Sequence, residues 1–137
     1  MTMNPSVLAL TLFVAWTLIL LLLMETGRSL LVIGRKKQSN EFKPDNANLS
    51  PFMQRLARAH ANCLEGFPIF GGLLLVAIAT GRHDMTDPLA YWLVAARVAQ
   101  STVHLMSLSV LAVNVRFTFF VVQMLIAVRW VWSLVFV

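Results

Sequence analysis

Four long apolar blocks occupy most of this 137-residue chain. They cover residues 7–33, 55–80, 89–113 and 117–137, and each is as long as the roughly 20 residues that an α-helix needs to cross a bilayer. Hydrophobic residues make up 58% of the sequence and charged residues 12%, whereas about 25% of a soluble domain is charged. We therefore expect an all-α integral membrane four-helix bundle, with residues 1–137 as a single four-span transmembrane domain.

Three linkers separate these blocks: GRKKQSNEFKPDNANLSP, GRHDMTDP and AVNVR. Basic residues concentrate in and just after the first linker, and Arg116 belongs to the third, whereas the second carries Arg82. Because Lys and Arg are enriched in cytoplasmic loops, we expect the first and third linkers in the cytoplasm and both termini on the other side. In a bacterium, this would place the protein in the inner or cell membrane.

The net charge of +5 is attributed to contacts with lipid headgroups and with an anionic ligand, and no nucleic acid partner is expected. Cys63 is the single cysteine, so an intramolecular disulfide is excluded. We expect Cys63 to be a small buried hydrophobe, and we expect no metal site.

Polar residues form a stripe along the second block. Arg58, Asn62 and Glu65 share one face of a helix, because residues three and four apart are neighbours on its surface. The arginine could simply extend to the headgroups. Glu65 is more informative, since an acid within the hydrocarbon costs about 2.5–3.5 kcal/mol and normally faces a partner or a water-filled cavity. Pro68 predicts a bend that either opens space for a ligand or accompanies close helix packing.

A second polar stripe lies on the third block, where Arg97, Gln100 and His104 share one face. An arginine so deep in a membrane needs an anionic partner. Since Glu65 and Glu25 are the two acids within the blocks, we expect an ion pair between Arg97 and Glu65.

Other polar residues are expected to have structural roles. Glu25 and Arg28 are spaced for an ion pair along one helix. Ser107 and Ser109 are interpreted as helix-packing residues. Arg129, which lies among tryptophans, is interpreted as an anchor at the far membrane surface.

Five polar residues from three blocks fall within the cytoplasmic third of the bundle: Arg58, Asn62, Glu65, His104 and Arg116. Cations, an amide and one carboxylate suit a small zwitterionic ligand with a net negative charge. The surrounding lipid gives an apolar substrate a route of entry.

The segment RAHANCLEGFPIF contains the pattern R-x-x-x-N-x-x-E-x-x-P at Arg58, Asn62, Glu65 and Pro68. This pattern resembles the second-helix signature of the membrane-associated proteins in eicosanoid and glutathione metabolism, the MAPEG family. That family includes microsomal glutathione transferases and the leukotriene-forming and prostaglandin E synthases. ARVAQSTVH in the third block and Arg116 give further support.

The resemblance implies a homotrimer that binds glutathione between subunits on the cytoplasmic side, as a co-substrate. It implies a glutathione transferase that conjugates the glutathione thiolate to lipophilic electrophiles, with reduction of lipid hydroperoxides as a second activity. Arg116 would lie against the sulfur and stabilise the thiolate, and His60 would serve the adjacent subunit. The glutathione contacts carried over are Arg58, His60, Asn62, Glu65, Arg97, Gln100 and His104.

The sequence also departs from the family's synthases. His104 stands where they have a tyrosine, and Phe119 and Phe120 follow Arg116 where a prostaglandin-type enzyme has tyrosine. These differences favour a broad transferase over a specific eicosanoid synthase. Two other functions stay open: a small proton-coupled multidrug-type exporter that uses a membrane acid, and a non-catalytic MAPEG-like membrane protein.

Overall fold

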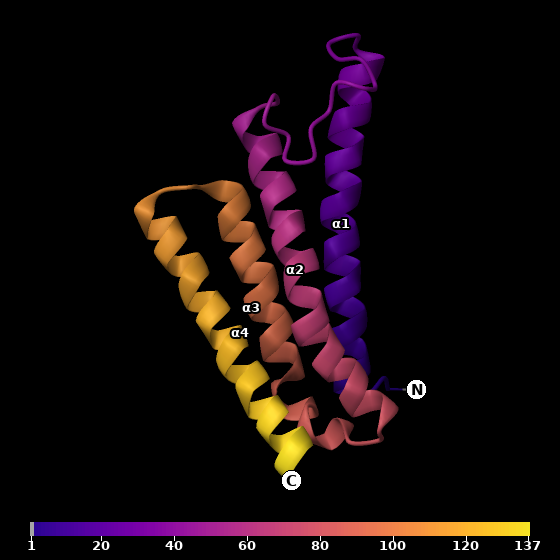
Figure 1. Ribbon diagram of the computed structural model, residues 1–137, viewed down its shortest axis with the longest axis vertical. Coiled ribbons are helices and arrows are strands. Elements are labelled where there is room, and N and C mark those ends of the chain that lie inside the picture. Colours follow the sequence, from indigo (N-terminus) through magenta and orange to yellow (C-terminus); the bar gives the residue numbers. More distant parts are fainter. Residues whose placement is uncertain (1) are drawn as a thin grey trace.

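The computed structural model describes residues 2–137. Within that range, four long helices run side by side: α1 (Pro5–Ile33), α2 (Pro51–Ala79), α3 (Asp87–Met106) and α4 (Val110–Phe136), with a short 3-10 helix η1 (His83–Met85) before α3 (Figure 1). Both termini lie at one end of the bundle, and the loop between α1 and α2 lies at the other. The expected all-α four-helix architecture is confirmed.

Side-chain caps set the starts of three helices. The side chain of Asn4 accepts hydrogen bonds from backbone N–H groups in the first turn of α1, and Ser50 and Ser109 do the same for α2 and α4. Such caps satisfy donors that have no partner within the helix. Pro5 and Pro51 occupy the first helical positions, where a missing N–H costs nothing.

The turn between α3 and α4 lies earlier than the sequence suggested. The expected boundary at residues 112–116 is wrong, because α3 ends at Met106 and α4 begins at Val110. The hydroxyl of Ser107 accepts from the backbone N–H of Ser109 at 3.0 Å, and Ser109 then caps α4. These serines build the turn instead of packing helices, and Arg116 consequently lies inside α4.

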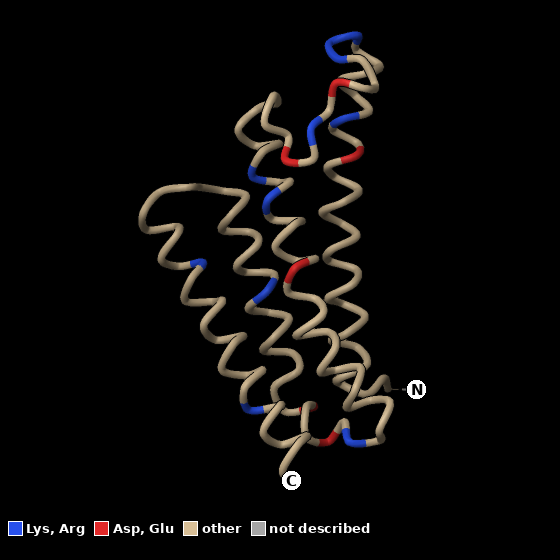
Figure 2. The backbone as a smooth tube through the Cα atoms, viewed as in Figure 1, with Lys and Arg blue, Asp and Glu red and all other residues tan. Residues whose placement is uncertain are grey.

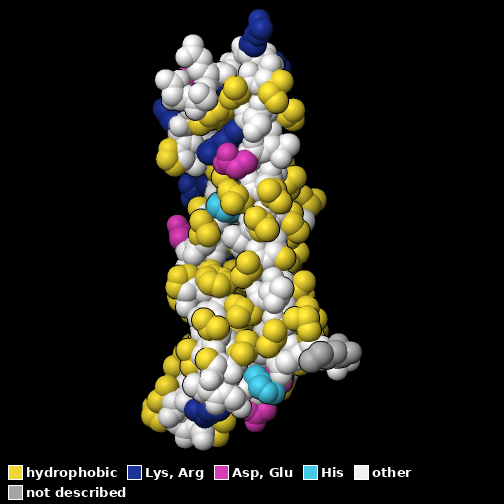
Figure 3. Space-filling view, turned by 90° about the vertical axis from the view of Figure 1, so that its right-hand side faces the viewer, with side chains coloured by type: hydrophobic (Ala, Val, Ile, Leu, Met, Phe, Trp, Pro, Cys, Tyr) yellow, Lys and Arg dark blue, Asp and Glu magenta, His cyan; other side chains and the backbone are white. Residues whose placement is uncertain are grey.

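Three of the helices described, α1, α2 and α4, are long and apolar enough to cross a membrane. The 20-residue α3 is not in this group; among the residues it buries are Arg97, Ser101 and His104. It packs against all three other long helices. Most charged residues lie toward the two ends of the bundle, although an acidic and a basic position also lie near its middle (Figure 2). Hydrophobic side chains cover much of the middle of the face shown in Figure 3.

Two apolar clusters form the core. One lies toward the termini and includes Phe13, Phe70, Leu93 and Trp130. The other joins α1 to α2 and includes Cys63, which is fully buried with its sulfur 3.4 Å from the Ser101 hydroxyl. The expectation that Cys63 is a small buried residue is confirmed.

A polar network ties the start of α1 to the start of α3. Asp87 accepts a hydrogen bond from the backbone N–H of Ser6 at 3.1 Å and another from the Ser6 hydroxyl. Asn4 donates to Asp87 at 3.2 Å, and His83 Nδ1 lies 3.0 Å from the same carboxylate. Ser6 is fully buried. The network therefore connects α1 to α3 within the interior, at the end of the bundle where both termini lie.

Arg28 organises the opposite end. Its guanidinium lies 3.0 Å from Glu25, which confirms the expected ion pair. It also donates to the buried side chain of Asn46 at 2.7 Å and to the carbonyl of Lys43 at 3.1 Å. Asn46 in turn donates to the carbonyl of Met53, so the loop is held against α1 and α2.

Candidate functional site

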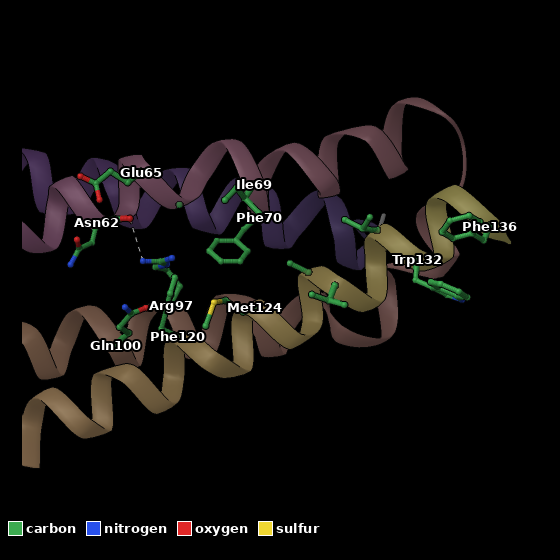
Figure 4. A pocket seen from close by; sticks show the side chains of 14 residues that line it. Asn62, Glu65, Ile69, Phe70, Arg97, Gln100, Phe120, Met124, Trp132 and Phe136 are labelled. Carbon is green, nitrogen blue, oxygen red and sulfur yellow. Dashed lines mark hydrogen bonds between the residues drawn. The ribbon is translucent and has the colours of Figure 1, made fainter.

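A groove of about 740 Å³ opens between α2, α3 and α4. Four polar residues line one end of it: Asn62, Glu65, Arg97 and Gln100. The rest of the lining is apolar and comes from α2 and α4: Gly66, Ile69, Phe70, Phe120, Met124, Ala127, Val128, Val131, Trp132 and Phe136 (Figure 4). A polar ligand and an apolar ligand could therefore lie end to end in this groove.

Arg97 is the most unusual residue of the groove. Only 2% of it is exposed, and its guanidinium carbon lies 5.5 Å from the ring centre of Phe13 and 5.4 Å from that of Phe70. Nη1 donates to the carbonyl of Asn62 at 3.4 Å. Within residues 2–137, Nε and Nη2 are buried and have no hydrogen-bond partner.

Gly66 makes the space that Arg97 occupies. A Cβ atom at this position would lie 2.6 Å from Nη2 of Arg97. Such a contact is far inside van der Waals distance, so any larger residue would displace the guanidinium. This role of Gly66 could not be predicted from the sequence, because it depends on a contact between two helices.

The expected ion pair between Arg97 and Glu65 is wrong for this chain. Glu65 is exposed and its carboxylate points away from Arg97 in Figure 4. The two salt bridges among residues 2–137 lie elsewhere. Because few acids lie within the apolar blocks, the sequence indicated which residues could pair with Arg97. It could not indicate the direction of the Glu65 side chain.

A cluster of basic residues lies beside the polar end of the groove. His104 is 3% exposed, and its Nδ1 lies 3.4 Å from Nδ2 of Asn62. Arg55, Arg58 and Arg116 lie close enough for their charges to act on His104. In the part of the chain described, the buried Nε of Arg116 has no hydrogen-bond partner, so this cluster suits an anion.

His60 lies apart from the groove. It is half-buried, and the charges that act on it come from Glu25 and Arg28, on α1. Four of the seven proposed glutathione contacts line the groove, namely Asn62, Glu65, Arg97 and Gln100. His104 lies beside Asn62, and the charges of Arg58 and Arg116 act on His104. His60 remains a prediction for a neighbouring subunit.

Gln123 is a further polar residue beside the site that was not among the residues predicted from the sequence. It is fully buried, and its Nε2 donates to Oε1 of Gln100 at 2.9 Å and to the carbonyl of Phe119 at 3.0 Å. An amide inside an otherwise apolar block is costly without a partner. The position of Gln123 as a lone amide among apolar residues was a signal in the sequence that could have identified it.

The hydrogen bond between Gln100 and Gln123 allows depths to be compared along α3 and α4. At about 1.5 Å per residue, Arg116 lies about 10 Å from this bond toward the α1–α2 loop end, and Phe136 lies about 20 Å from it in the other direction. The polar end of the groove and its apolar part thus lie at different depths along the bundle.

In residues 2–137, no group of three His, Cys, Asp or Glu side chains is placed to hold a metal ion. The polar groups in and beside the groove are guanidinium groups, amides, an imidazole and one carboxylate. These groups can bind and orient a ligand that carries negative charge.

Comparison with known proteins gives one result at the level of families. Residues 6–136 match the family model described as the MAPEG family. No curated protein and no solved structure matches the chain.

Proposed function

The chain belongs to the MAPEG family, and from this premise we propose that it is a membrane-bound glutathione transferase acting on lipophilic electrophiles. The family is one in which many members are glutathione-dependent enzymes. The observation that supports the proposal most strongly is the composition of the groove, which joins a polar mouth to an apolar length of α2 and α4. A water-soluble thiol and an apolar substrate can meet where the two parts join.

Glutathione carries two carboxylates and one ammonium group, and the mouth offers matching partners. In the proposal, Arg58 and the amide of Asn62 bind carboxylate and peptide groups, and Glu65 binds the ammonium. Guanidinium groups can bind carboxylates through two parallel hydrogen bonds. His104, Gln100 and Arg97 form the deeper boundary of this site, and His60 would contribute from a neighbouring subunit.

Arg116 is proposed to act on the sulfur. A guanidinium beside it favours the thiolate, which is the nucleophilic form. The thiolate attacks an electrophilic carbon, a C–S bond forms, and the leaving group departs with the bonding electrons. With a lipid hydroperoxide, two glutathione molecules are oxidised to the disulfide while the hydroperoxide is reduced to an alcohol and water.

A homotrimer is proposed because Arg58 and Glu65 are exposed in the single chain, and a neighbouring subunit could cover them and complete the site. The α1–α2 loop end is proposed to face the cytoplasm, with both termini outside, on the basis of its excess of Lys and Arg. Light scattering of the purified protein tests the trimer, and reporter fusions to the C-terminus test the orientation.

Conjugation of glutathione to chlorodinitrobenzene by the purified protein tests the proposed activity. We expect turnover, and we expect Arg116→Ala to lower kcat/KM about tenfold or more, the effect of one pKa unit on the thiol. Arg129→Ala is the matched control, because Arg129 is an exposed arginine on the same helix. Unchanged activity in Arg116→Ala would leave a transferase but remove Arg116 from its proposed role.

The other candidate functions predict different results. An exporter needs a membrane carboxylate that takes up and releases protons, and Glu25 is already paired with Arg28. If the protein neither binds glutathione nor turns over the aryl halide, an exporter or a non-catalytic protein becomes the better interpretation. Binding of glutathione without turnover would favour the non-catalytic one.

A further inference from the structure

A second pocket, of about 320 Å³, lies between the end of α1 and the start of α2. Part of its lining is apolar: Gly27, Leu31, Leu49 and Met53. The other residues that line it are polar: Lys36, Lys37, Asn48 and Ser50. Pockets that hold small ligands begin at about 300 Å³, so this pocket has room for one small polar group with a short apolar part.

The turn after α1 holds the backbone that carries the two lysines. The backbone N–H of Lys36 donates to the carbonyl of Leu31 at 2.9 Å, and that of Lys37 donates to the same carbonyl at 3.3 Å. Arg35, just before them, has a φ of 57°, which is the left-handed conformation that often ends a helix. The lysines therefore belong to a folded turn against α1 and not to a free tail.

The charges of the two lysines are not neutralised within residues 2–137, because the salt bridges there join other residues. Figure 2 shows both basic and acidic positions at this end of the bundle. The acids of the loop, Glu41 and Asp45, do not line the pocket. Asp45 instead accepts a hydrogen bond from the backbone N–H of Ala47 at 3.0 Å. The pocket thus has two ammonium groups and no carboxylate in its lining.

The start of α2 adds to the positive potential of this pocket. The Ser50 hydroxyl accepts a hydrogen bond from the backbone N–H of Met53 at 3.3 Å, so its own hydrogen is free to donate to a ligand. The positive end of the α2 dipole also lies here, since Ser50 is the residue that caps this helix. Ammonium groups and a hydroxyl beside a helix start suit an anion rich in oxygen.

We propose that this pocket binds the phosphate of a phospholipid whose headgroup carries a net negative charge. Lys36 and Lys37 contact the phosphate oxygens, and the Ser50 hydroxyl donates to one of them. The glycerol part of the lipid lies against the apolar lining of Leu31 and Met53. Basic pockets between membrane helices are known to suit anionic headgroups in this way.

The surroundings of the pocket favour a lipid over a soluble phosphate. Leu30 and Ile33, on the last turn of α1, and Phe52, on the first turn of α2, are all exposed. Acyl chains that leave the pocket can cover these apolar side chains, whereas a soluble phosphate has no part that would do so. A choline headgroup is disfavoured, because it would bring a further cation to two lysines.

This pocket and the groove between α2, α3 and α4 have no lining residue in common. Binding of the lipid requires neither glutathione nor turnover, so its test is independent of the proposed transferase activity. A lipid in this pocket would contact both α1 and α2 and would join them at the loop end of the bundle.

Native mass spectrometry of the delipidated, full-length protein in a nonionic detergent tests the proposal. The probes are phosphatidylglycerol and phosphatidylcholine with identical acyl chains, and glycerol 3-phosphate. We expect phosphatidylglycerol to bind about tenfold more tightly than phosphatidylcholine, the effect of one or two lysine contacts. Equal binding of the two lipids would overturn the proposal. Glycerol 3-phosphate that binds as tightly as phosphatidylglycerol would also overturn it, because the ligand would then be a soluble phosphate.

Two double variants locate the site, and each removes two positive charges from the same loop. Lys36→Gln with Lys37→Gln should weaken phosphatidylglycerol about tenfold and abolish its advantage over phosphatidylcholine. Arg35→Gln with Lys43→Gln is the matched control, since both residues are exposed and lie outside the pocket lining, and it should retain most of that advantage. An equal loss in both variants would assign the preference to the overall charge of the loop and contradict the proposed pocket.

Folding of each variant is checked by circular dichroism and by oligomeric state. If the double variant in the pocket does not fold, Lys36→Gln and Lys37→Gln are measured separately, and each should lose part of the preference for phosphatidylglycerol. Wild-type preference in both single variants would show that the lipid binds elsewhere.

Discussion

Gln123 of α4 donates a hydrogen bond to Gln100 of α3 at 2.9 Å, in the interior of the bundle. Gln123 is fully buried, whereas Gln100 also lines the groove. The bond therefore connects the packing of α4 to the polar end of the site. It fixes the register of the two helices that place Arg97 and Arg116.

Gln123→Met removes this bond while keeping the side-chain length. We expect a loss of about 0.6–1.7 kcal/mol in the free energy of unfolding, the range found for hydrogen bonds between membrane helices. Unfolding in mixed micelles measures it. Gln38→Met, in the exposed part of the α1–α2 loop, is the control and should change little. Equal effects of both variants would show that the bond does not stabilise the bundle.

Gly66 and Gly72 lie on the same helix but in different surroundings. Gly66→Ala should destabilise the protein by about 1–3 kcal/mol, because the new methyl group would lie on Arg97. Gly72→Ala meets nothing within 4 Å and should stabilise α2 by about 0.5–1 kcal/mol. Both free energies come from the same unfolding assay, and a stabilising Gly66→Ala would contradict the close approach.

Asp87 holds the terminal end of the bundle through Ser6 and Asn4. Asp87→Ala leaves the buried Ser6 hydroxyl and N–H with fewer acceptors, and we expect a loss of about 1–3 kcal/mol in unfolding free energy. Asp84→Ala is the matched control, since Asp84 is exposed. If the two variants unfold alike, the network around Asp87 makes no net contribution to stability.

Asn62 is expected to contribute binding of glutathione but not chemistry. Asn62→Ala should raise KM for glutathione about tenfold, the effect of one or two lost hydrogen bonds, with kcat little changed. Steady-state kinetics at saturating aryl halide measure both constants. Asn40→Ala, at an exposed loop position, serves as the control. An unaltered KM in Asn62→Ala would exclude this residue from the glutathione site.

The number of helices, their order and the polar face of α2 could be predicted from the sequence. Long apolar blocks and the spacing of Arg58, Asn62 and Glu65 are local properties, and helix geometry converts such spacing into a shared face. The same locality identified the pair of Glu25 and Arg28, three residues apart on one helix.

The rest depends on contacts between helices or on turns without strong signals. The α3–α4 turn at Ser107–Ser109 contains neither Gly nor Pro and lies within an apolar stretch, so the sequence placed it too late. The direction of Glu65 and the space beside Gly66 follow from how α2 packs on α3. The spacing of residues within a single apolar block predicts neither of them.

The long helices differ in length, and this difference affects how the bundle fits bilayers of different thickness. α1 and α2 have 29 residues each and α3 has 20, so they measure about 44 Å and 30 Å. α3 alone matches the hydrocarbon thickness of an average bilayer. In a thicker bilayer, hydrophobic mismatch would draw the guanidinium groups of Arg58 and Arg116 toward acyl chains, at a cost in free energy for every ångström. The thickness of the surrounding lipid therefore sets how well water reaches the mouth of the groove.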